Sequence, residues 1–270
     1  MNSAVRDLEG RTALVTGSTR RGIGAATAIV LAYRGADVVL NYGTGGGGGG
    51  AQERAEALRA AIEQRAGVCA IAIEASMLSE AAVHRLFDEA RGHFGSVDIL
   101  VNSAGGLWVE QDFADITTSH WEQALRPEID GTFYCIREAL PDMRARQWGR
   151  IVNIGFDVDT LELLINAHYG HVLERYPFDF HIAKSAKREM ARRLAPIEFK
   201  QGITINNVLP GVIENIDNDE VFAAVEGTSR GSTWFGPVDV AGTVAFLCSE
   251  AARGITGSDI RLPGNLYKRL

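Results

Sequence analysis

Hydrophobic positions along the 270-residue chain form short continuous runs that alternate with longer segments of helical periodicity. Apolar runs rich in β-branched residues predict strands at 11–17, 36–42, 68–74, 97–105, 149–155, 202–211 and 258–264. Apolar residues spaced three and four apart predict helices at 22–34, 51–66, 79–94, 130–147, 180–200 and 238–251. Apolar strands separated by helices are typical of a parallel sheet covered on both faces. We therefore expect a single α/β domain over residues 1–270, with a mobile loop at the six glycines 45–50.

Composition and charge narrow the class of protein. A hydrophobic content of 46% suffices for a sizeable core. The net charge of -7 and the absence of basic runs argue against a nucleic-acid partner. No stretch approaches roughly 18 apolar residues, and the N-terminus lacks the pattern of a signal peptide, so we expect no membrane partner and a cytoplasmic location. The cysteines at 69, 135 and 248 are far apart and odd in number, which predicts reduced thiols and no metal site.

A glycine-rich turn follows the first predicted strand and is the most informative motif. In TALVTGSTRRGIGAATAIVLAYRGADVVLNY the turn opens a helix at Gly22 to Ala26, and a second strand follows. Glycines let the backbone approach a pyrophosphate, which binds the unsatisfied N–H groups and positive dipole end of the helix. The context predicts nucleotide binding, and the alternative is a sterically required turn without a ligand.

The chain resembles the short-chain dehydrogenase/reductase family over roughly residues 8–265. The family's Thr-Gly-x-x-x-Gly-x-Gly turn is similar to the segment with Thr16, Gly17, Gly22 and Gly24, apart from one extra residue. VNSAG at 101–105 resembles the family's Asn-Asn-Ala-Gly segment, and residues 210–211 match its turn after the sixth strand. The resemblance implies a doubly wound Rossmann fold with seven parallel strands, a nicotinamide cofactor, a small-molecule substrate and a homodimer or homotetramer.

Residues near the glycine turn bear on the choice of coenzyme. An acidic residue at the end of the second strand would favour NAD(H), but this position falls at Asn41 or Tyr42. Arg20 and Arg21 can pair with a 2′-phosphate, so NADP(H) is favoured over NAD(H). The alternative for each arginine is a solvated loop cation. Ser76 stands where the family has an aspartate beside the adenine, which predicts a differently built adenine pocket.

The predicted coenzyme contacts combine the turn with the ends of later strands. They are Gly17, Ser18, Arg20, Arg21, Gly22, Ile23, Gly24, Asn41, Ser76, Asn102, Ala104, Gly105, Lys184, Pro210 and Gly211.

The resemblance breaks at the catalytic positions. Family members use an asparagine, a serine, and a tyrosine and lysine one helical turn apart, and the tyrosine protonates the alkoxide that hydride addition creates. The matching positions here are Glu128, Phe156, Phe180 and Lys184. A phenyl ring can neither donate a proton nor bind an oxyanion, so a non-standard proton donor is required.

Two residues are candidates for this donor. The separation of Phe156 from Phe180 exceeds the family's, and the inserted segment at 157–177 contains Tyr176, our preferred donor. His181 is the second candidate, because a histidine titrates near neutral pH. Alternatively, the insertion is a surface or dimer-contact loop and neither residue acts.

Lys184 and Glu128 each allow two interpretations. With a coenzyme bound, Lys184 is expected to grip the nicotinamide ribose, and otherwise it is a partly exposed helix cation. Glu128 can act near the cleft, on a proton or on a cationic substrate such as an iminium. Since it follows Pro127, we favour an exposed helix start for Glu128.

A segment at 212–236 occupies the place of the family's substrate lid. Its Phe222, Trp234 and Phe235, with Trp108, can wall a pocket for a fairly large ring-containing substrate, or simply pack together. We expect an atypical NADP(H)-dependent reductase or dehydrogenase acting on a ketone, an enone or an imine. The alternatives are a non-redox cyclase, isomerase or dehydratase and a catalytically silent homologue.

Overall fold

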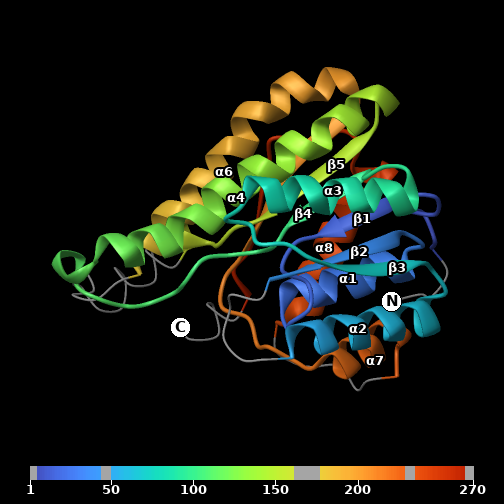
Figure 1. The fold of residues 1–270 in the computed structure, drawn as a ribbon, viewed down its shortest axis with the longest axis horizontal. Coiled ribbons are helices and arrows are strands. Elements are labelled where there is room, and N and C mark those ends of the chain that lie inside the picture. The colour runs from blue at the N-terminus through green and yellow to red at the C-terminus, as the bar shows by residue number, and fades with distance from the viewer. Residues whose placement is uncertain (1–4, 44–49, 161–176, 229–234, 265–270) are drawn as a thin grey trace.

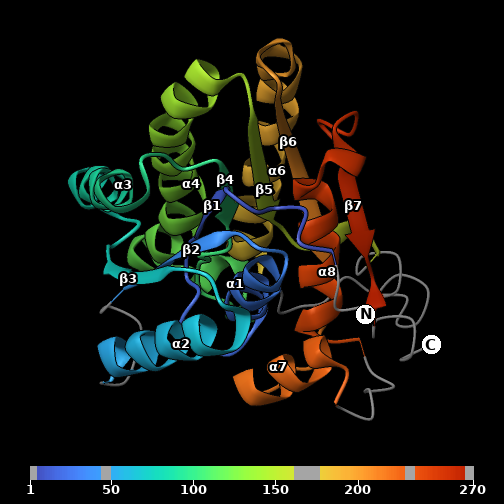
Figure 2. The ribbon, with the colours of Figure 1, turned by 90° about the vertical axis from the view of Figure 1, so that its right-hand side faces the viewer.

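The computed structural model describes residues 5–43, 50–160, 177–228 and 235–264. Seven parallel strands form one sheet in the order β3-β2-β1-β4-β5-β6-β7. Figure 1 shows the fold, and Figure 2 labels every strand. The strands are β1 (Thr12–Val15), β2 (Asp37–Tyr42), β3 (Ala70–Glu74), β4 (Ile99–Asn102), β5 (Gly149–Ile154), β6 (Ile203–Pro210) and β7 (Asp259–Leu262). The predicted doubly wound seven-stranded sheet is confirmed, and its strand order reverses between β1 and β4.

Helices cover both faces of the sheet (Figure 2). Those that contribute to one core cluster are α1 (Ile23–Tyr33), α2 (Ala51–Ala66), α7 (Asn218–Glu226) and α8 (Pro237–Cys248). Those on the opposite face are α3 (Glu80–Phe94), α4 (Thr118–Arg146) and α6 (Phe178–Glu198). Short 3₁₀ helices occur at η1 (Phe113–Asp115), η2 (Phe199–Gln201) and η3 (Glu250–Ala252).

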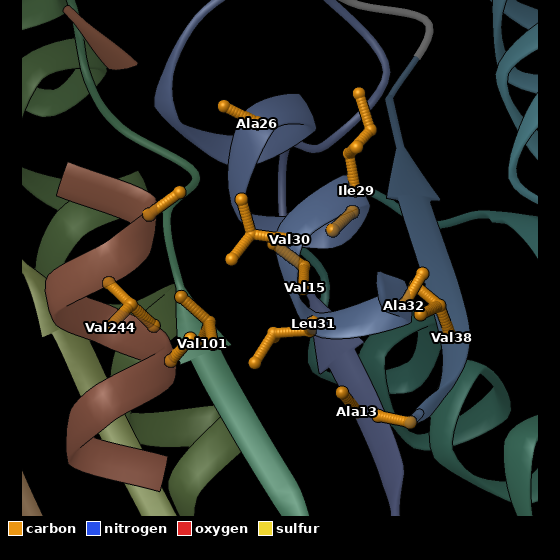
Figure 3. Packing of buried hydrophobic residues seen from close by; sticks show 14 of the residues in the cluster. Ala13, Val15, Ala26, Ile29, Val30, Leu31, Ala32, Val38, Val101 and Val244 are labelled. Atoms are coloured by element: carbon orange, nitrogen blue, oxygen red, sulfur yellow. The ribbon is translucent and has the colours of Figure 1, made fainter. Parts of the chain in front are cut away.

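Helix α1 is buried along most of its length. Its residues from Gly24 to Ala32 are buried, because the sheet lies on one side and α8 and α7 pack on others. Figure 3 shows Val30 and Leu31 of α1 facing Val101 of β4 and Val244 of α8. The helix therefore has a fixed position, and so does the glycine turn at its N-terminus.

Helix α4 begins earlier than the predicted start at residue 130. Thr117 caps it, with its hydroxyl oxygen accepting a hydrogen bond from His120 N at 3.2 Å. The helix continues through Pro127 and Pro141 to Arg146. This early start places Glu128 inside the helix, and α4 runs beyond the sheet in Figure 1.

Helix α7 was not predicted. Asp217 N donates to Glu220 Oε2 at 2.9 Å, an N-terminal capping contact at the start of the helix. The helix lies within the predicted lid at 212–236, of which residues 229–234 fall outside the described residues.

Two other predicted segments are only partly described. The glycine run is described at Gly50 alone, and the inserted segment only at residues 157–160 and 177, so Tyr176 lies outside the described residues. Among the described helices, none is both long enough and apolar enough to cross a bilayer.

Candidate active site

A cavity of about 280 Å³ opens where β1, β4, β5 and β6 end. In an open parallel sheet this crevice beside the reversal of strand order is the usual ligand site. The cavity brings the glycine turn together with Lys184. Its lining residues are Gly17, Arg20, Arg21, Gly22, Ile23, Gly24, Ser103, Ile154, Gly155, Phe156, Phe180, Lys184, Pro210 and Gly211.

Close backbone approach explains the glycines of the turn. Gly17 has a φ of +63°, and a Cβ there would lie 2.9 Å from Ala104 Cα. A Cβ on Gly24 would lie 2.5 Å from Gly17 O. The turn is thus compact, and it leaves the first N–H groups of α1, which have no partners inside the helix, at the cavity wall. This arrangement fits an anionic phosphate group.

Asn41 and Ser18 support the turn from behind. Both are buried; Asn41 Oδ1 accepts from Gly17 N at 3.2 Å, and Asn41 O accepts from Ser18 N at 3.0 Å. Asn41 Nδ2 in turn donates to Ala75 O at 3.1 Å. The structure therefore places these two predicted contacts behind the cavity wall, and the end of β2 carries a neutral amide.

The two arginines of the turn are exposed at the cavity. Arg21 Nη1 lies 3.0 Å from Asp217 Oδ1, which joins the turn to the start of α7. Ser76 lies in the loop after β3, exposed, and its Oγ accepts from Leu78 N at 3.3 Å. Ser76 is not one of the lining residues of this cavity.

The segment after β4 is held from both sides. Thr16 Oγ1 accepts from Ser103 N and Ala104 N, each at 3.0 Å. Asn102 Nδ2 donates to Asn153 Oδ1 at 2.9 Å. Ser103 lies on the cavity wall, whereas the predicted contacts Asn102, Ala104 and Gly105 are not among the residues that line it.

Glu128 is the residue whose place differs most from prediction. It is fully buried in the middle of α4, not at an exposed helix start, because the helix already begins at Thr118. Its Oε1 lies 2.7 Å from Lys184 Nζ and accepts from Gly106 N at 3.0 Å. Its Oε2 lies 2.5 Å from Lys187 Nζ. We call Glu128, Lys184 and Lys187 the lysine–glutamate triad.

The two ammonium groups of the triad have different surroundings. Lys187 is fully buried and also donates to Ala104 O at 3.2 Å and Asn102 O at 3.5 Å. Lys184 lines the cavity, donates to Ile154 O at 3.2 Å and lies 5.3 Å from the centre of the Phe180 ring. Lys184 is therefore not the partly exposed cation of the alternative interpretation, since only 7% of it is exposed.

Burial and charge compete within the triad. Burial lowers the pKa of Lys187 to about 8, although the Glu128 carboxylate favours its charged form. Burial alone would raise the pKa of Glu128, but Lys184 and Lys187 outweigh it and hold that pKa below its ordinary value. With all three groups ionised, the triad carries one net positive charge.

Aromatic rings form a further part of the cavity wall. Phe156 and Phe180 line the cavity, and Trp108 packs edge-on against them at centroid distances of 5.4 and 5.0 Å. His181 stacks on Phe156 at 5.5 Å with 18° between the ring planes. Burial lowers the pKa of His181 to about 4, so the imidazole is neutral near pH 7. His181 is not among the residues that line this cavity.

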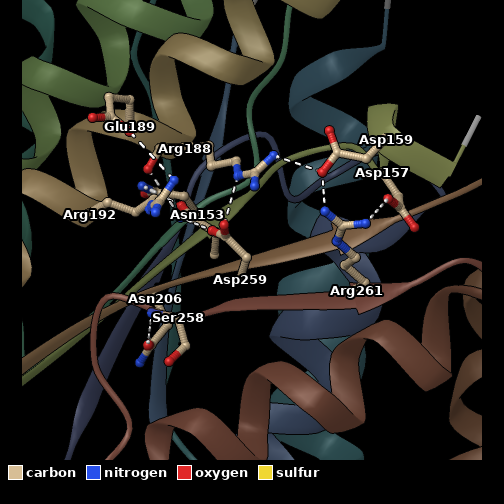
Figure 4. A network of polar contacts seen from close by, with 11 residues as sticks. Asn153, Asp157, Asp159, Arg188, Glu189, Arg192, Asn206, Ser258, Asp259 and Arg261 are labelled. Carbon is tan, nitrogen blue, oxygen red and sulfur yellow. Dashed lines mark hydrogen bonds and ion pairs between the residues drawn. The ribbon is translucent and has the colours of Figure 1, made fainter. Parts of the chain in front are cut away.

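The described part of the inserted segment is engaged in ion pairs. Asp159 Oδ2 lies 3.3 Å from Arg188 Nη1 and also contacts Arg261. Arg188 Nε continues to Asp259 Oδ2 at 2.7 Å, as Figure 4 shows. These contacts tie the chain after β5 to α6 and β7.

Lys187 was missed by sequence reasoning. It stands three residues after Lys184, so both lysines share one face of α6. Two lysines on the face that packs on the sheet would have indicated a buried acidic partner, because buried charges are paired. Glu128 is that partner.

A family model described as Enoyl-(Acyl carrier protein) reductase matches residues 17–264. The chain belongs to the short-chain dehydrogenase/reductase family. Curated relatives of this family member include a 3-oxoacyl-(acyl-carrier-protein) reductase of Aquifex aeolicus, 33% identical over 96% of this chain and 98% of the relative. Versicolorin reductase of Emericella nidulans is 33% identical over 97% of each chain.

Solved structures of similar chains share the fold of this short-chain dehydrogenase/reductase. A dehydrogenase/reductase from Sinorhizobium meliloti has a TM-score of 0.75 and 31% identity, with 96% of each chain covered. A blue fluorescent protein from a metagenomic library, in complex with NADPH, has a TM-score of 0.75 and 30% identity, covering 96% of this chain and 98% of that one.

Proposed function

We propose that this protein is an NADP(H)-dependent reductase that transfers hydride to a ketone, an enone or an imine of a fairly large apolar substrate. The observation that carries the proposal is that the glycine turn and Lys184 line one and the same cavity. The relatives named as reductases and the similar structure in complex with NADPH support it.

Three parts of the coenzyme have suitable partners in the cavity. The first N–H groups of α1 and the glycine turn suit the pyrophosphate. Arg20 and Arg21 suit the 2′-phosphate, since Asn41 brings no negative charge to the end of β2. Lys184 suits the nicotinamide ribose. The reduced coenzyme, when bound, supplies a hydride, and this chain's residues must orient the substrate and provide a proton.

The aromatic wall makes this family member atypical in our proposal. Phe156 and Phe180 stand where other members carry the serine and the tyrosine, so neither oxygen binding nor proton donation comes from those positions. The two apolar rings suit an apolar substrate. The proton comes from another group, for which Tyr176, His181 and Lys184 are the candidates. An iminium substrate would need no proton on oxygen.

A coenzyme titration tests the proposal. We expect purified protein to enhance NADPH fluorescence with saturation, and to consume NADPH with at least one of 2-tetralone, cyclohexenone and 2-phenyl-1-pyrroline. Binding without oxidation by any of these compounds would favour the non-redox alternatives. Absence of binding to both NADPH and NADH would contradict the proposal.

We further propose a homodimer or homotetramer, which the family resemblance implies. Light scattering of the purified protein measures the mass, and a monomer would contradict this part of the proposal.

A further inference from the structure

The described wall of the cavity contains few side chains that can release a proton. Phe156 and Phe180 have none, and the guanidinium groups of Arg20 and Arg21 do not deprotonate in proteins. Ser103 has a neutral hydroxyl, and its Oγ lies against the glycine turn, 3.1 Å from where a Cβ of Gly24 would be. Among these described wall residues, the ammonium of Lys184 is the remaining acid.

Lys184 and Lys187 differ in the number of hydrogen-bond acceptors that their ammonium groups contact. An ammonium has three N–H donors. Those of Lys187 have acceptors in Glu128, Ala104 O and Asn102 O. Within the described residues, the acceptors of Lys184 are Glu128 Oε1 and Ile154 O. Lys184 thus retains one donor for a ligand in the cavity that it lines.

We propose that the ammonium of Lys184 is the proton donor of the reduction, with its one remaining N–H serving the substrate oxygen instead of the nicotinamide ribose. Glu128 and Lys187 are positioning residues that make its proton loss feasible. This inference rests on the proposed function. A ketone carbon gains a hydride from the reduced nicotinamide coenzyme, and the electron pair of the C=O π bond moves to oxygen. That oxygen takes a proton from Lys184 Nζ, whose N–H electrons stay on nitrogen. The coenzyme is left oxidised, and the neutral amine regains a proton from water at the cavity mouth.

The charge of the triad explains why a second lysine is needed. A lone Lys184–Glu128 pair would leave an unpaired buried carboxylate once Lys184 gave up its proton, which is strongly unfavourable. Lys187 changes this outcome, since it lies 2.5 Å from Glu128 and remains its partner. The triad goes from one net positive charge to none, and no buried charge is left alone.

Lys184→Arg is the most direct test, because arginine keeps the positive charge but cannot donate a proton near neutral pH. We expect the variant to bind NADPH within about threefold of wild type by fluorescence titration, while kcat falls at least about 100-fold, the usual loss of a general acid. A kcat within about threefold of wild type would overturn the assignment of the proton to Lys184.

Amine rescue covers the case in which arginine does not fit. Lys184→Ala leaves space for a small amine, and we expect ethylammonium to raise its kcat in proportion to the protonated amine added. Tetramethylammonium, which has the charge but no proton, should have no effect. Failure of every primary amine to restore turnover would also overturn the assignment.

A charge-matched double variant tests the positioning residues. Lys187→Met should lower kcat by about 100-fold with NADPH affinity nearly unchanged, because proton loss from Lys184 then leaves a buried carboxylate alone. Adding Glu128→Gln removes that carboxylate, so K187M/E128Q should regain at least about tenfold in kcat over K187M. A double variant no faster than K187M contradicts the positioning role.

Different results would contradict the proposed function and the role of Lys184. Wild-type protein that does not consume NADPH contradicts the proposed function itself. Wild-type turnover with an equally active K184R variant contradicts only the role of Lys184. Tyr176→Phe and His181→Phe belong in the same series, since a loss of kcat in one of them with normal K184R turnover would assign the proton there.

Discussion

Glu128 shows how a single buried carboxylate depends on its partners. Its two oxygens contact two ammonium groups and one backbone N–H, and no part of the residue is exposed. Removing one member of a buried ionic group costs more than the group contributes, because the remaining charges lose their compensation.

Glu128→Gln should therefore destabilise the protein by about 3–5 kcal/mol near pH 7. The cost should be smaller near pH 9, because Lys187, with a pKa already lowered to about 8, is then largely neutral. Urea unfolding at the two pH values measures both effects. Glu122→Gln, an exposed change on the same helix, should cost less than about 0.5 kcal/mol and is the control. Equal losses in the two variants would contradict the burial argument.

His181 should make the folded state sensitive to acid. The unfolded imidazole gains a proton below about pH 6.5, while burial lowers the folded pKa to about 4. The unfolded state thus binds more protons between these values, so the free energy of unfolding falls as the pH drops from about 6.5 to 4. The contribution lost is up to about 3 kcal/mol.

His181→Phe tests this dependence, since the new ring keeps an aromatic partner for Phe156 and Trp108. Unfolding measured from pH 7 to 4 should show a flatter decline in H181F than in wild type. The exposed His93 supplies the control, because H93F should leave the decline unchanged. A parallel decline in wild type and H181F would show that His181 does not titrate in this range.

The sequence predicted those site residues whose positions are fixed by a local motif, but not the contacts between residues that are distant in the chain. The glycine turn, Lys184 and the two phenylalanines could be found, because motif spacing fixes them relative to one another. The contact between Glu128 and Lys187 could not, since it joins two helices, α4 and α6, that are far apart in the sequence. A neutral His181 could not be predicted either, because its pKa depends on the rings that surround it.

At the scale of elements, the loop after β4 and helix α4 approach closely at Gly106. A Cβ on Gly106 would lie 2.2 Å from Ala124 O, so Gly106→Ala must push the loop away from the helix. The Gly106 N–H to Glu128 bond would then be lost. We expect G106A to be destabilised by about 1–3 kcal/mol, as overpacked positions usually are, and to bind NADPH more weakly.

Gly92→Ala is the matched control for this substitution. Gly92 lies inside α3 and a Cβ there meets nothing within 4 Å. The alanine should stabilise α3 by about 0.4–1 kcal/mol and leave NADPH binding unchanged. Urea unfolding and fluorescence titration of both variants make the comparison. A G106A protein with the stability and NADPH affinity of wild type would show that the loop can move away from α4 at no cost in free energy.

Element interiors were predicted better than element ends. All seven strands lie within their predicted ranges, and α2 was predicted with its observed bounds at 51–66. The start of α4 was missed because Pro127 suggested a first helical turn, whereas the actual cap is the hydroxyl of Thr117. Helix α7 was missed because its short sequence was interpreted as part of a lid. Tertiary packing determines whether a helix continues through a proline and whether a short segment becomes helical.

At the scale of the whole molecule, coenzyme binding is linked to stability. The chain has a net charge of -7, yet two arginines lie at the cavity that is proposed to take the coenzyme phosphates. A ligand that binds only the folded protein raises its melting temperature with concentration. NADPH should therefore raise the Tm more than NADH does at equal concentration. Arg20→Ala with Arg21→Ala should remove this difference and leave the NADH shift unchanged.

The ion pair between Arg21 and Asp217 allows a sharper form of this test. Their atoms are 3.0 Å apart and both side chains are about two-thirds exposed, so the carboxylate competes with a 2′-phosphate for the same guanidinium. Asp217→Asn removes the competitor. The Tm shift with NADPH should then increase in D217N, whereas the shift with NADH, which has no 2′-phosphate, should stay the same. If both shifts rise together, Asp217 acts through general charge repulsion of the coenzyme. If neither rises, Arg21 does not contact the 2′-phosphate, and the coenzyme preference depends on Arg20 or on the neutral end of β2.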